Sequence, residues 1–261
     1  MKILFIGDVF ARPGRAVLRD NLQSIIEEYK IDFCIANGEN SAGGKGISRA
    51  VAQELYEAGV EAITLGNHAW DNKDVLSFID TDPCIVRAYN YPPDVPGNGW
   101  TTVTAQNGCN IVVAQLCCRL FMTPIDCPFQ AVDNMLEEIG NQAIILVDIH
   151  GEATSEKMAL GWYMNGRVSA VIGTHTHIPT ADERIMSGGT AYITDAGMTG
   201  AFDSIIGMDI ETATSRFVTG MKVPFRIAKH NLKVAGVVIT VDEQNGKAES
   251  IERILYPGAT V

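Results

Sequence analysis

Short apolar runs that stop at glycine or at a polar residue recur along the chain and constrain its fold more than any other feature. They are KILFIG, DFCIANGEN, EAITLGNH, AIILVDIHGE, VSAVIGTHTH and TAYITDAG. Runs of this kind are typical of strands that are buried on both faces of a sheet. The sequence therefore predicts a sheet whose strands lie inside the protein.

Segments with apolar residues at helical spacing separate several of these runs. Ser48 is a typical N-cap residue and Gly59 a typical C-terminal stop, so we expect one helix between them. Strands and helices in alternation predict an α/β fold. The helical segments are RAVLRDNLQSIIEEYK at 15–30, SRAVAQELYEAG at 48–59 and FQAVDNMLEEIG at 129–140.

Two further segments indicate antiparallel hairpins. Alternating residues flank Asn107-Gly108 and again Asn245-Gly246, and this dipeptide is a strong hairpin signal. The sequence has neither a low-complexity linker nor an evident internal repeat. We therefore expect residues 1–261 to form a single domain with additional antiparallel strands.

Charge and hydropathy exclude some classes of partner. The net charge of −11 argues against bulk nucleic-acid binding, which needs a basic face. It leaves room for a small phosphate ester, because a bound cation can reverse the local charge. No stretch approaches the roughly 20 apolar residues that a membrane helix needs. The first apolar run is interrupted at Gly7 and Asp8, too early for a signal peptide.

The cysteines indicate a reducing compartment. None of the six forms a CxxC pair, and four lie in apolar or strand-like surroundings. Buried free thiols are favoured over disulfides in such a pattern. We therefore expect a cytoplasmic protein.

Polar side chains gather where the predicted strands end, and ligands of open α/β sheets bind outside the carboxyl ends of strands. Taken singly, each residue is also a common turn, loop or core residue. Four of the five histidines lie in these segments, however, with His230 as the exception. Together they indicate one site at a sheet edge. The residues are Asp8, Glu39, Asn40, Asn67, His68, His150, His175 and His177.

The residue types in this set indicate a pair of metal ions. Carboxylate, amide oxygen and imidazole ligands suit manganese, iron, cobalt or zinc. No cysteine lies among them, which argues against a structural zinc site. Glu39 can bridge two ions through its two oxygens.

The same motifs resemble those of the calcineurin-like metallophosphoesterases. The matching stretches are GD at 7–8, GEN at 38–40, GNH at 66–68, His150 after a strand, and GTHTH at 173–177. Over nearly the whole chain, and in order, longer stretches resemble the bacterial YmdB-like branch of that superfamily. These are IGDVFARPGR, NGENSAGGKGIS, TLGNHAWD, VDIHGEATSEK, IGTHTHIPTAD and TDAGMTG.

The resemblance implies two facing, largely mixed β-sheets flanked by helices, with the metals at the strand ends. It also implies roles for the site residues, with Glu39 as the bridge between the ions and His68 as the proton donor. Asp8, Glu39, Asn40 and His177 would hold the first metal, and Glu39, Asn67, His150 and His175 the second.

Three positions depart from the wider superfamily in the manner of the YmdB-like branch. Phe10 stands where a histidine ligand is usual, Glu39 replaces the usual aspartate bridge, and Thr174 is added to the last motif. Asn40 is a plausible substitute for the lost ligand. An oxygen ligand in place of nitrogen shifts the preference toward iron or manganese over zinc.

These ligands suggest a hydrolytic mechanism in which a metal-bridging hydroxide attacks phosphorus and His68 gives a proton to the leaving oxygen. Two divalent ions with Asp8, Glu39 and the hydroxide would leave a site charge of about +1. That charge suits a singly charged phosphodiester. The resemblance points to 2′,3′-cyclic nucleoside monophosphates.

Other side chains are weaker candidates. Arg12, Arg15 and Lys45 follow ligand segments and could contact a phosphate, or could be solvated loop charges. The loop at 119–129 could stack on a base, or could pack in the core or an interface.

Two other functions remain as alternatives. One is a regulatory nucleotide-binding protein with incidental catalysis, against which His68 argues, and the other is a phosphomonoesterase. An amidohydrolase barrel has the wrong motif order, since His175 and His177 come late in this chain. We also expect a homo-oligomer, because symmetric dimers are common among such proteins.

Overall fold

Eight strands form the first of two sheets in the structure, a computed structural model that describes residues 1–257. Their order is β2-β12-β13-β1-β3-β4-β5, and β14 pairs with β13. Strands β1, β3, β4 and β5 run parallel, whereas β13 is antiparallel to β1. The bounds are β1 Lys2–Ile6, β2 Asp8–Val9, β3 Phe33–Asn37, β4 Ala62–Thr64, β5 Ile85–Val86, β12 Met198–Ala201, β13 Leu232–Val241 and β14 Ala248–Tyr256.

Six strands form the second sheet, in the order β10-β11-β9-β8-β7-β6. The four central strands are parallel, and the edge strands β6 and β10 are antiparallel to their neighbours. Both sheets are therefore mixed. The bounds are β6 Trp100–Thr104, β7 Asn110–Cys117, β8 Ile144–His150, β9 Ala170–Thr174, β10 Arg184–Ile185 and β11 Ala191–Ile193.

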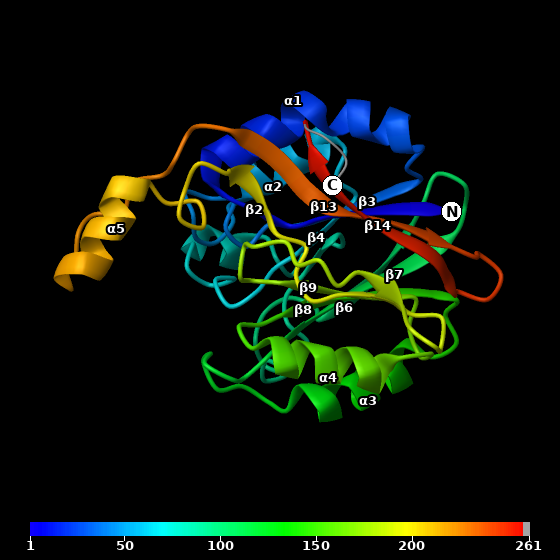
Figure 1. Ribbon diagram of the computed structural model, residues 1–261. Helices are drawn as coiled ribbons and strands as arrows, with labels where there is room; N and C mark the ends of the chain where they lie inside the picture. The colour runs from blue at the N-terminus through cyan, green and yellow to red at the C-terminus, as the bar shows by residue number, and fades with distance from the viewer. Residues whose placement is uncertain (258–261) are drawn as a thin grey trace.

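Helices cover the outer face of each sheet, so that the protein has four layers (Figure 1). Helices α1 and α2 pack on the first sheet, and α3 and α4 on the second. Helix α5 stands apart from these layers (Figure 1). The helical bounds are α1 Ala11–Tyr29, α2 Arg49–Ala58, η1 Lys73–Ser77, α3 Pro128–Ile139, α4 Thr154–Met164 and α5 Ile210–Thr219.

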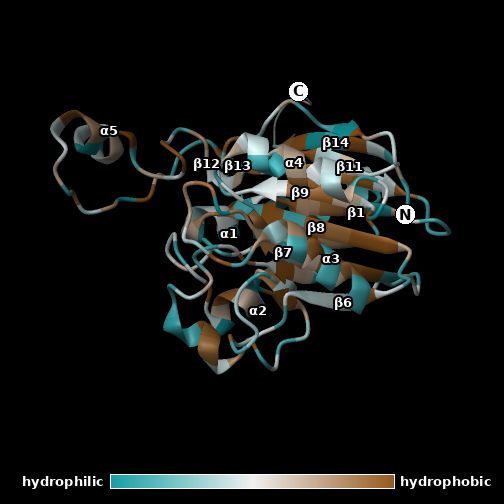
Figure 2. Cartoon of the chain, turned by 90° about the horizontal axis from the view of Figure 1, so that it is seen from below, coloured by the Kyte–Doolittle hydropathy of each residue, from teal (hydrophilic) through white to brown (hydrophobic). Residues whose placement is uncertain are grey.

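The pleat of β1 shows how the core is divided. Ile3 and Phe5 pack between the two sheets, whereas Leu4 and Ile6 point the other way, into the cluster beneath α1 and α2. Because successive strand residues face opposite sides, an unbroken apolar run fills two clusters at once. Figure 2 shows this hydrophobic colouring along the central strands.

The predicted pattern of strands and hairpins is confirmed. The six apolar runs form β1, β3, β4, β8, β9 and β11. The hairpin at 107–108 joins β6 to β7, and that at 245–246 joins β13 to β14. The two facing mixed sheets flanked by helices are those expected from the family resemblance. That the whole of residues 1–261 forms one domain stays a prediction.

The predicted helices are present, with one boundary corrected. The Ser48 hydroxyl accepts a hydrogen bond from Val51 N at 3.3 Å, and Gly59 ends α2 in the left-handed conformation. Helix α1 begins at Ala11 rather than at Arg15. The N-cap residue of α1, Phe10, has no side-chain hydrogen bond to the helix, so the sequence gives no capping signal for its start. Instead, Ala11 N donates to Asn40 O, a contact between segments far apart in the chain.

The remaining findings concern thiols and membrane helices. All six cysteines are free thiols, as expected, and three of them are buried. Within residues 1–257, none of the helices combines the length and the apolar character that crossing a bilayer would need.

Substitution of Gly173 tests how closely β9 packs against the neighbouring backbone, next to the strand ends that carry the predicted ligands. A Cβ at this position would lie 1.7 Å from the carbonyl oxygen of Thr194. We expect Gly173→Ala to lower the free energy of unfolding by more than about 2 kcal/mol, because backbone must shift to admit the methyl group. Urea denaturation measures this loss.

Gly200→Ala is the matched control, since its added Cβ would meet its nearest atom at 3.4 Å. It should change the free energy of unfolding by less than about 1 kcal/mol. Equal stability of the two variants would contradict the packing described for β9.

Candidate metal centre

The predicted ligands lie at the carboxyl ends of strands in both sheets. In the first sheet they follow β1, β3 and β4, and in the second they end β8 or follow β9. The sequence alone suggested one sheet edge, whereas the structure builds the site between two facing sheets. It brings together all eight predicted residues: Asp8, Glu39, Asn40, Asn67, His68, His150, His175 and His177.

One group of side chains surrounds the amide of Asn40. Its Nδ2 lies 3.0 Å from Glu39 Oε1, 3.4 Å from Asp8 Oδ1 and 3.2 Å from His177 Nε2. An amide nitrogen carries only two hydrogens, fewer than the three acceptors around it. His177 Nδ1 lies 3.0 Å from Ile206 O, a contact that favours a proton on Nδ1 and a free lone pair on Nε2.

A second group surrounds Nε2 of His150. This atom lies 2.8 Å from Asn67 Oδ1, 3.1 Å from Glu39 Oε1 and 3.0 Å from His175 Nδ1. Glu39, His150 and His175 each offer one ligand atom, and these atoms lie within 4.8 Å of one another. Glu39 Oε1 thus belongs to both groups.

Burial and mutual charge set the protonation of the second group. Burial opposes ionisation of Glu39, yet the charge and hydrogen bond of His150 lower the pKa of its carboxyl to about 2. Burial also opposes a charged His150, but Glu39 raises the pKa of that imidazole to about 9. Burial, together with the charge of His150, lowers the pKa of His175 to about 3. The group therefore favours one positive charge, on His150, and opposes a second one on His175.

These contacts fit a pair of metal ions. Oxygen and nitrogen acceptors from several elements surround Asn40 Nδ2 and His150 Nε2, and neither of these atoms carries enough hydrogens to satisfy them. Buried acceptors that face one another are costly without a proton or cation between them. The donor atoms are carboxylate, amide and imidazole, which suit divalent transition metals. Glu39, His150 and His175 can hold a metal ion.

Gly66 explains why a glycine precedes Asn67 and His68. A Cβ on Gly66 would lie 2.4 Å from Glu39 Oε2 and 2.6 Å from the ring of His150. Any larger residue would therefore push two candidate ligands apart. The backbone N–H of His68 donates to the same Glu39 oxygen at 2.9 Å, which fixes the carboxylate.

A buried carboxylate beneath the ligands supports His150. Thr174 Oγ1 lies 2.9 Å from His150 Nδ1 and donates to Asp148 Oδ1 at 2.6 Å. Asn37 and Thr64 donate to the other oxygen of Asp148. Burial raises the pKa of Asp148 to about 6, despite these hydrogen bonds and the charge of His150. The sequence did not indicate this support, because each residue lies inside a predicted strand.

A buried ion pair holds the segment that carries the last two histidines. Lys157 Nζ donates to Asp195 Oδ2 at 2.9 Å and to Thr174 O at 3.0 Å. Asp195 also accepts from the backbone and hydroxyl of Thr176. The segment needs such support because His175 and His177 have positive φ values of 98° and 67°, which are strained for histidine.

Asp71 is a functional candidate that the sequence interpretation missed. Its Oδ2 lies 2.9 Å from Nδ1 of His68. This contact fixes the imidazole and leaves its Nε2 as the nitrogen without a protein partner among the described residues. The signal was present in GNHAWD, where the aspartate follows the histidine by three residues within one turn.

A cavity of about 650 Å³ opens on the predicted ligands. Glu39, His68 and His175 lie on one side of it. Lys45, Glu152 and Thr176 also line it, together with apolar side chains, some of which lie on the two segments that lead to α5. The apolar lining is Phe10, Ile206, Met208, Phe225 and Ile227.

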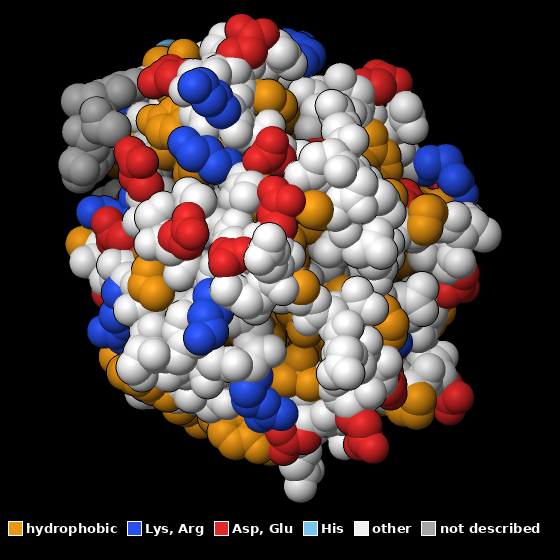
Figure 3. Space-filling model, turned by 90° about the vertical axis from the view of Figure 1, so that its right-hand side faces the viewer, with side chains coloured by type: hydrophobic (Ala, Val, Ile, Leu, Met, Phe, Trp, Pro, Cys, Tyr) orange, Lys and Arg blue, Asp and Glu red, His pale blue; other side chains and the backbone are white. Residues whose placement is uncertain are grey.

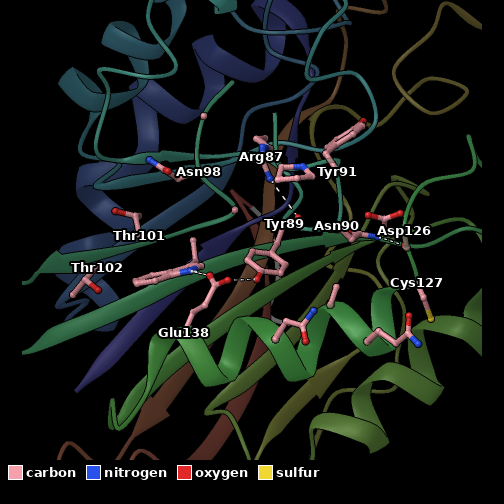
Figure 4. Close-up of a pocket in the computed structure, with 17 residues that line it drawn as sticks. Arg87, Tyr89, Asn90, Tyr91, Asn98, Thr101, Thr102, Asp126, Cys127 and Glu138 are labelled. Atoms are coloured by element: carbon pink, nitrogen blue, oxygen red, sulfur yellow. Dashed lines mark hydrogen bonds between the residues drawn. The ribbon is translucent and has the colours of Figure 1, made fainter. Parts of the chain in front are cut away.

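A larger cavity of about 820 Å³ lies between the loop at 87–102 and α3, and Figure 4 shows its lining. None of the predicted ligands lines it. Several of its polar groups already have partners: Arg87 donates to backbone carbonyls, and both Tyr89 and Trp100 donate to Glu138. We assign it no function.

The weaker candidates for contact with a phosphate or a base differ in whether they line the smaller cavity. Arg15 donates to Glu54 and to Ser41 O, so it braces a loop. Lys45 lines the smaller cavity and lies 3.9 Å from Asp71. Arg12 and the loop at 119–129 do not line that cavity.

Comparison with known families agrees with this arrangement. The family model described as YmdB-like protein matches residues 4–254. The chain belongs to the YmdB-like family.

Relatives of this YmdB-like protein match it almost from end to end. It is 49% identical to the 2′,3′-cyclic-nucleotide 2′-phosphodiesterase of Bacillus subtilis, over 98% of this chain and 97% of the relative. A hypothetical protein from Thermus thermophilus has a TM-score of 0.92 at 44% identity, covering 98% and 99% of the two chains. A phosphatase from Mycoplasma pneumoniae has a TM-score of 0.91 at 33% identity, covering 98% and 92%.

Thr174→Val tests whether the hydroxyl beneath His150 positions a ligand in this YmdB-like protein. The substitution keeps the shape of the side chain but removes the group next to His150 Nδ1. Loss of such a partner typically weakens metal binding by about 10–100-fold. Titration with Mn²⁺, followed by metal analysis after dialysis, measures the change.

Thr190→Val is the matched control, since Thr190 is equally buried but bonds to Val168 O, away from the predicted ligands. It should leave metal affinity within about threefold of the unsubstituted protein. Equal affinities for both variants would contradict the positioning role of Thr174.

Proposed function

We propose that this chain is a metal-dependent phosphodiesterase that hydrolyses small phosphodiesters, in particular 2′,3′-cyclic nucleoside monophosphates. One observation carries the proposal: eight polar side chains from two sheets converge beside one cavity. The name of the B. subtilis relative supports the substrate class. The size of the cavity, about 650 Å³, is within the range of small-molecule sites.

Two groups of residues would hold the ions, which we propose to be iron or manganese. Glu39 belongs to both groups and would bridge them. When bound, the ions would generate a nucleophile from water and neutralise charge on the phosphoryl oxygens. The first group is Asp8, Glu39, Asn40 and His177, and the second is Glu39, Asn67, His150 and His175.

His68 would supply the proton for the leaving oxygen. Its Nδ1 contacts Asp71, so Nε2 is the atom left for the substrate. A ribose alkoxide is a poor leaving group, and protonation by a positioned acid typically contributes about 10²–10⁴ in rate. Asp71 would position the ring through this contact.

The apolar side of the cavity would accommodate the nucleoside. When the phosphate lies at the ligands, the rest of the substrate must extend along the remaining lining. Phe225 is the aromatic residue of that lining with the greatest exposure, and its ring, which has Arg216 at 5.2 Å from its centroid, would stack on a base. Stacking of this kind tolerates any base, because every base has a π-face.

A panel of three substrates tests the proposed function. The protein, supplied with Mn²⁺, is incubated with 2′,3′-cyclic AMP, 3′,5′-cyclic AMP and 3′-AMP. We expect turnover of the first to 3′-AMP, with little further release of phosphate. Phosphate release from 3′-AMP at a comparable rate would instead indicate a phosphomonoesterase. Tight binding of 2′,3′-cyclic AMP without turnover would favour the regulatory alternative.

His68→Ala should lower kcat on 2′,3′-cyclic AMP by about 10²–10⁴, because it removes the proposed proton donor to the ribose oxygen. Metal content should be unchanged. A p-nitrophenyl phosphodiester has a good leaving group, so its hydrolysis should fall by less than about tenfold. Asp71→Asn should show the same substrate pattern with a smaller loss. Equal losses on both substrates would contradict proton donation.

Phe225→Ala should raise KM for 2′,3′-cyclic AMP by about tenfold, the effect of losing one base-stacking contact. Methyl riboside 2,3-cyclic phosphate lacks a base, so its KM should stay unchanged. Phe121→Ala is the matched control, because this ring is 90% exposed and lies outside the cavity. Equal effects on both substrates would show that Phe225 does not contact the base.

A further inference from the structure

The cavity beside the predicted ligands has a carboxylate that neither ligand group uses, that of Glu152. Among the described residues, Glu39 and Glu152 are the acidic ones that line this cavity. Glu39 is buried and belongs to both ligand groups, whereas the side chain of Glu152 is 53% exposed. The carboxylate of Glu152 therefore meets whatever molecule enters the cavity.

Neighbouring strands hold the backbone that precedes Glu152. His150 ends β8, and its carbonyl oxygen accepts a hydrogen bond from Cys118 N at 2.9 Å. Gly151 N donates to Thr174 O at 3.4 Å, and a Cβ on Gly151 would lie 2.5 Å from the side chain of Cys118. Because Glu152 follows this closely packed segment directly, its side chain starts from a fixed point beside the cavity.

The imidazole of His175 lies between this carboxylate and the second group of predicted ligands. Its Nδ1 is 3.0 Å from His150 Nε2, and its Nε2 is 3.4 Å from Glu152 Oε2. A carboxylate is a common partner for the nitrogen of a metal-bound imidazole that faces away from the metal. One ring therefore separates the charge of Glu152 from the centre at which the phosphate would bind.

Direct contact with a basic side chain does not compensate this charge. Within residues 1–257, Glu152 forms an ionic contact with His175 but with no lysine or arginine. Lys45, the basic residue of the cavity lining, lies 3.9 Å from Asp71 instead. On the face of the molecule in Figure 3, by contrast, acidic side chains are interspersed with basic ones. A metal-bound imidazole is neutral, so His175 would leave the charge of Glu152 in place.

We propose that Glu152 determines specificity by disfavouring phosphates that carry a second negative charge, a role that rests on the proposed phosphodiesterase function. Two divalent ions with Asp8, Glu39 and a hydroxide leave a charge of about +1, which a singly charged diester balances. The carboxylate of Glu152 opposes the further charge of a monoester. The site thus retains the cyclic diester and releases the monoester product.

Binding of methyl phosphate and dimethyl phosphate tests this role without turnover. At about pH 8 the first carries nearly two negative charges and the second carries one. Calorimetric titration of the Mn²⁺-loaded protein gives both dissociation constants. Glu152→Gln should lower that of dimethyl phosphate by about fivefold and that of methyl phosphate by about 25-fold, because the repulsion scales with ligand charge. Metal content should not change, since glutamine keeps an oxygen acceptor for His175 Nε2.

Two further variants separate charge from shape and place. Glu152→Asp keeps the charge, so the ratio of the two dissociation constants should stay within about twofold of the unsubstituted protein. Glu137→Gln is the matched control, since this exposed glutamate lies on α3, outside the cavity, and should change neither constant.

Equal changes for both ligands in Glu152→Gln would overturn the proposal, as would no change in either. The proposed function fails separately from it. A protein that shows this charge selectivity but does not hydrolyse 2′,3′-cyclic AMP would contradict the phosphodiesterase function and leave the role of Glu152 in anion selection intact.

Discussion

The site depends above all on one buried carboxylate, that of Glu39. One oxygen faces Asn40 and His150, and the other accepts the backbone N–H of His68. A buried carboxylate is stable only when charge or hydrogen bonds compensate it. Glycine at position 66 and histidine at 150 are therefore consequences of where this side chain lies. The same carboxylate joins the two groups of predicted ligands into one centre.

The two sheets divide the work of holding this centre. The first sheet supplies the carboxylates and amides, whereas the second supplies His150 and the segment with His175 and His177. Behind the second set lie Asp148 and the ion pair of Lys157 with Asp195, all buried. Removing one partner of such a pair strands a charge, typically at a cost of about 3–5 kcal/mol. These supports explain how strained histidine backbone persists at the site.

Much of this arrangement could be predicted from the sequence, because the strands are apolar runs and the candidate ligands follow them directly. Hydrophobic periodicity could not show that the strands form two facing sheets. That expectation came from the family resemblance. Helix α4 was missed because it buries Glu156 and Lys157, which break an amphipathic pattern. Helix α5 was missed although its sequence carries the signals of a helix, with Asp209 as N-cap and Gly220 as the residue that ends it. Asp195 acts through contacts that only the folded chain reveals, whereas the spacing of His68 and Asp71 already indicated theirs.

The most direct test of the account is the metal dependence of 2′,3′-cyclic AMP hydrolysis. The protein is stripped with a chelator, shown to remain folded, and assayed while Mn²⁺ is added back with the bound metal counted. Turnover should disappear on stripping and return as two ions bind to each chain. Full turnover by metal-free protein would contradict it, and so would a folded chain that binds no metal at all.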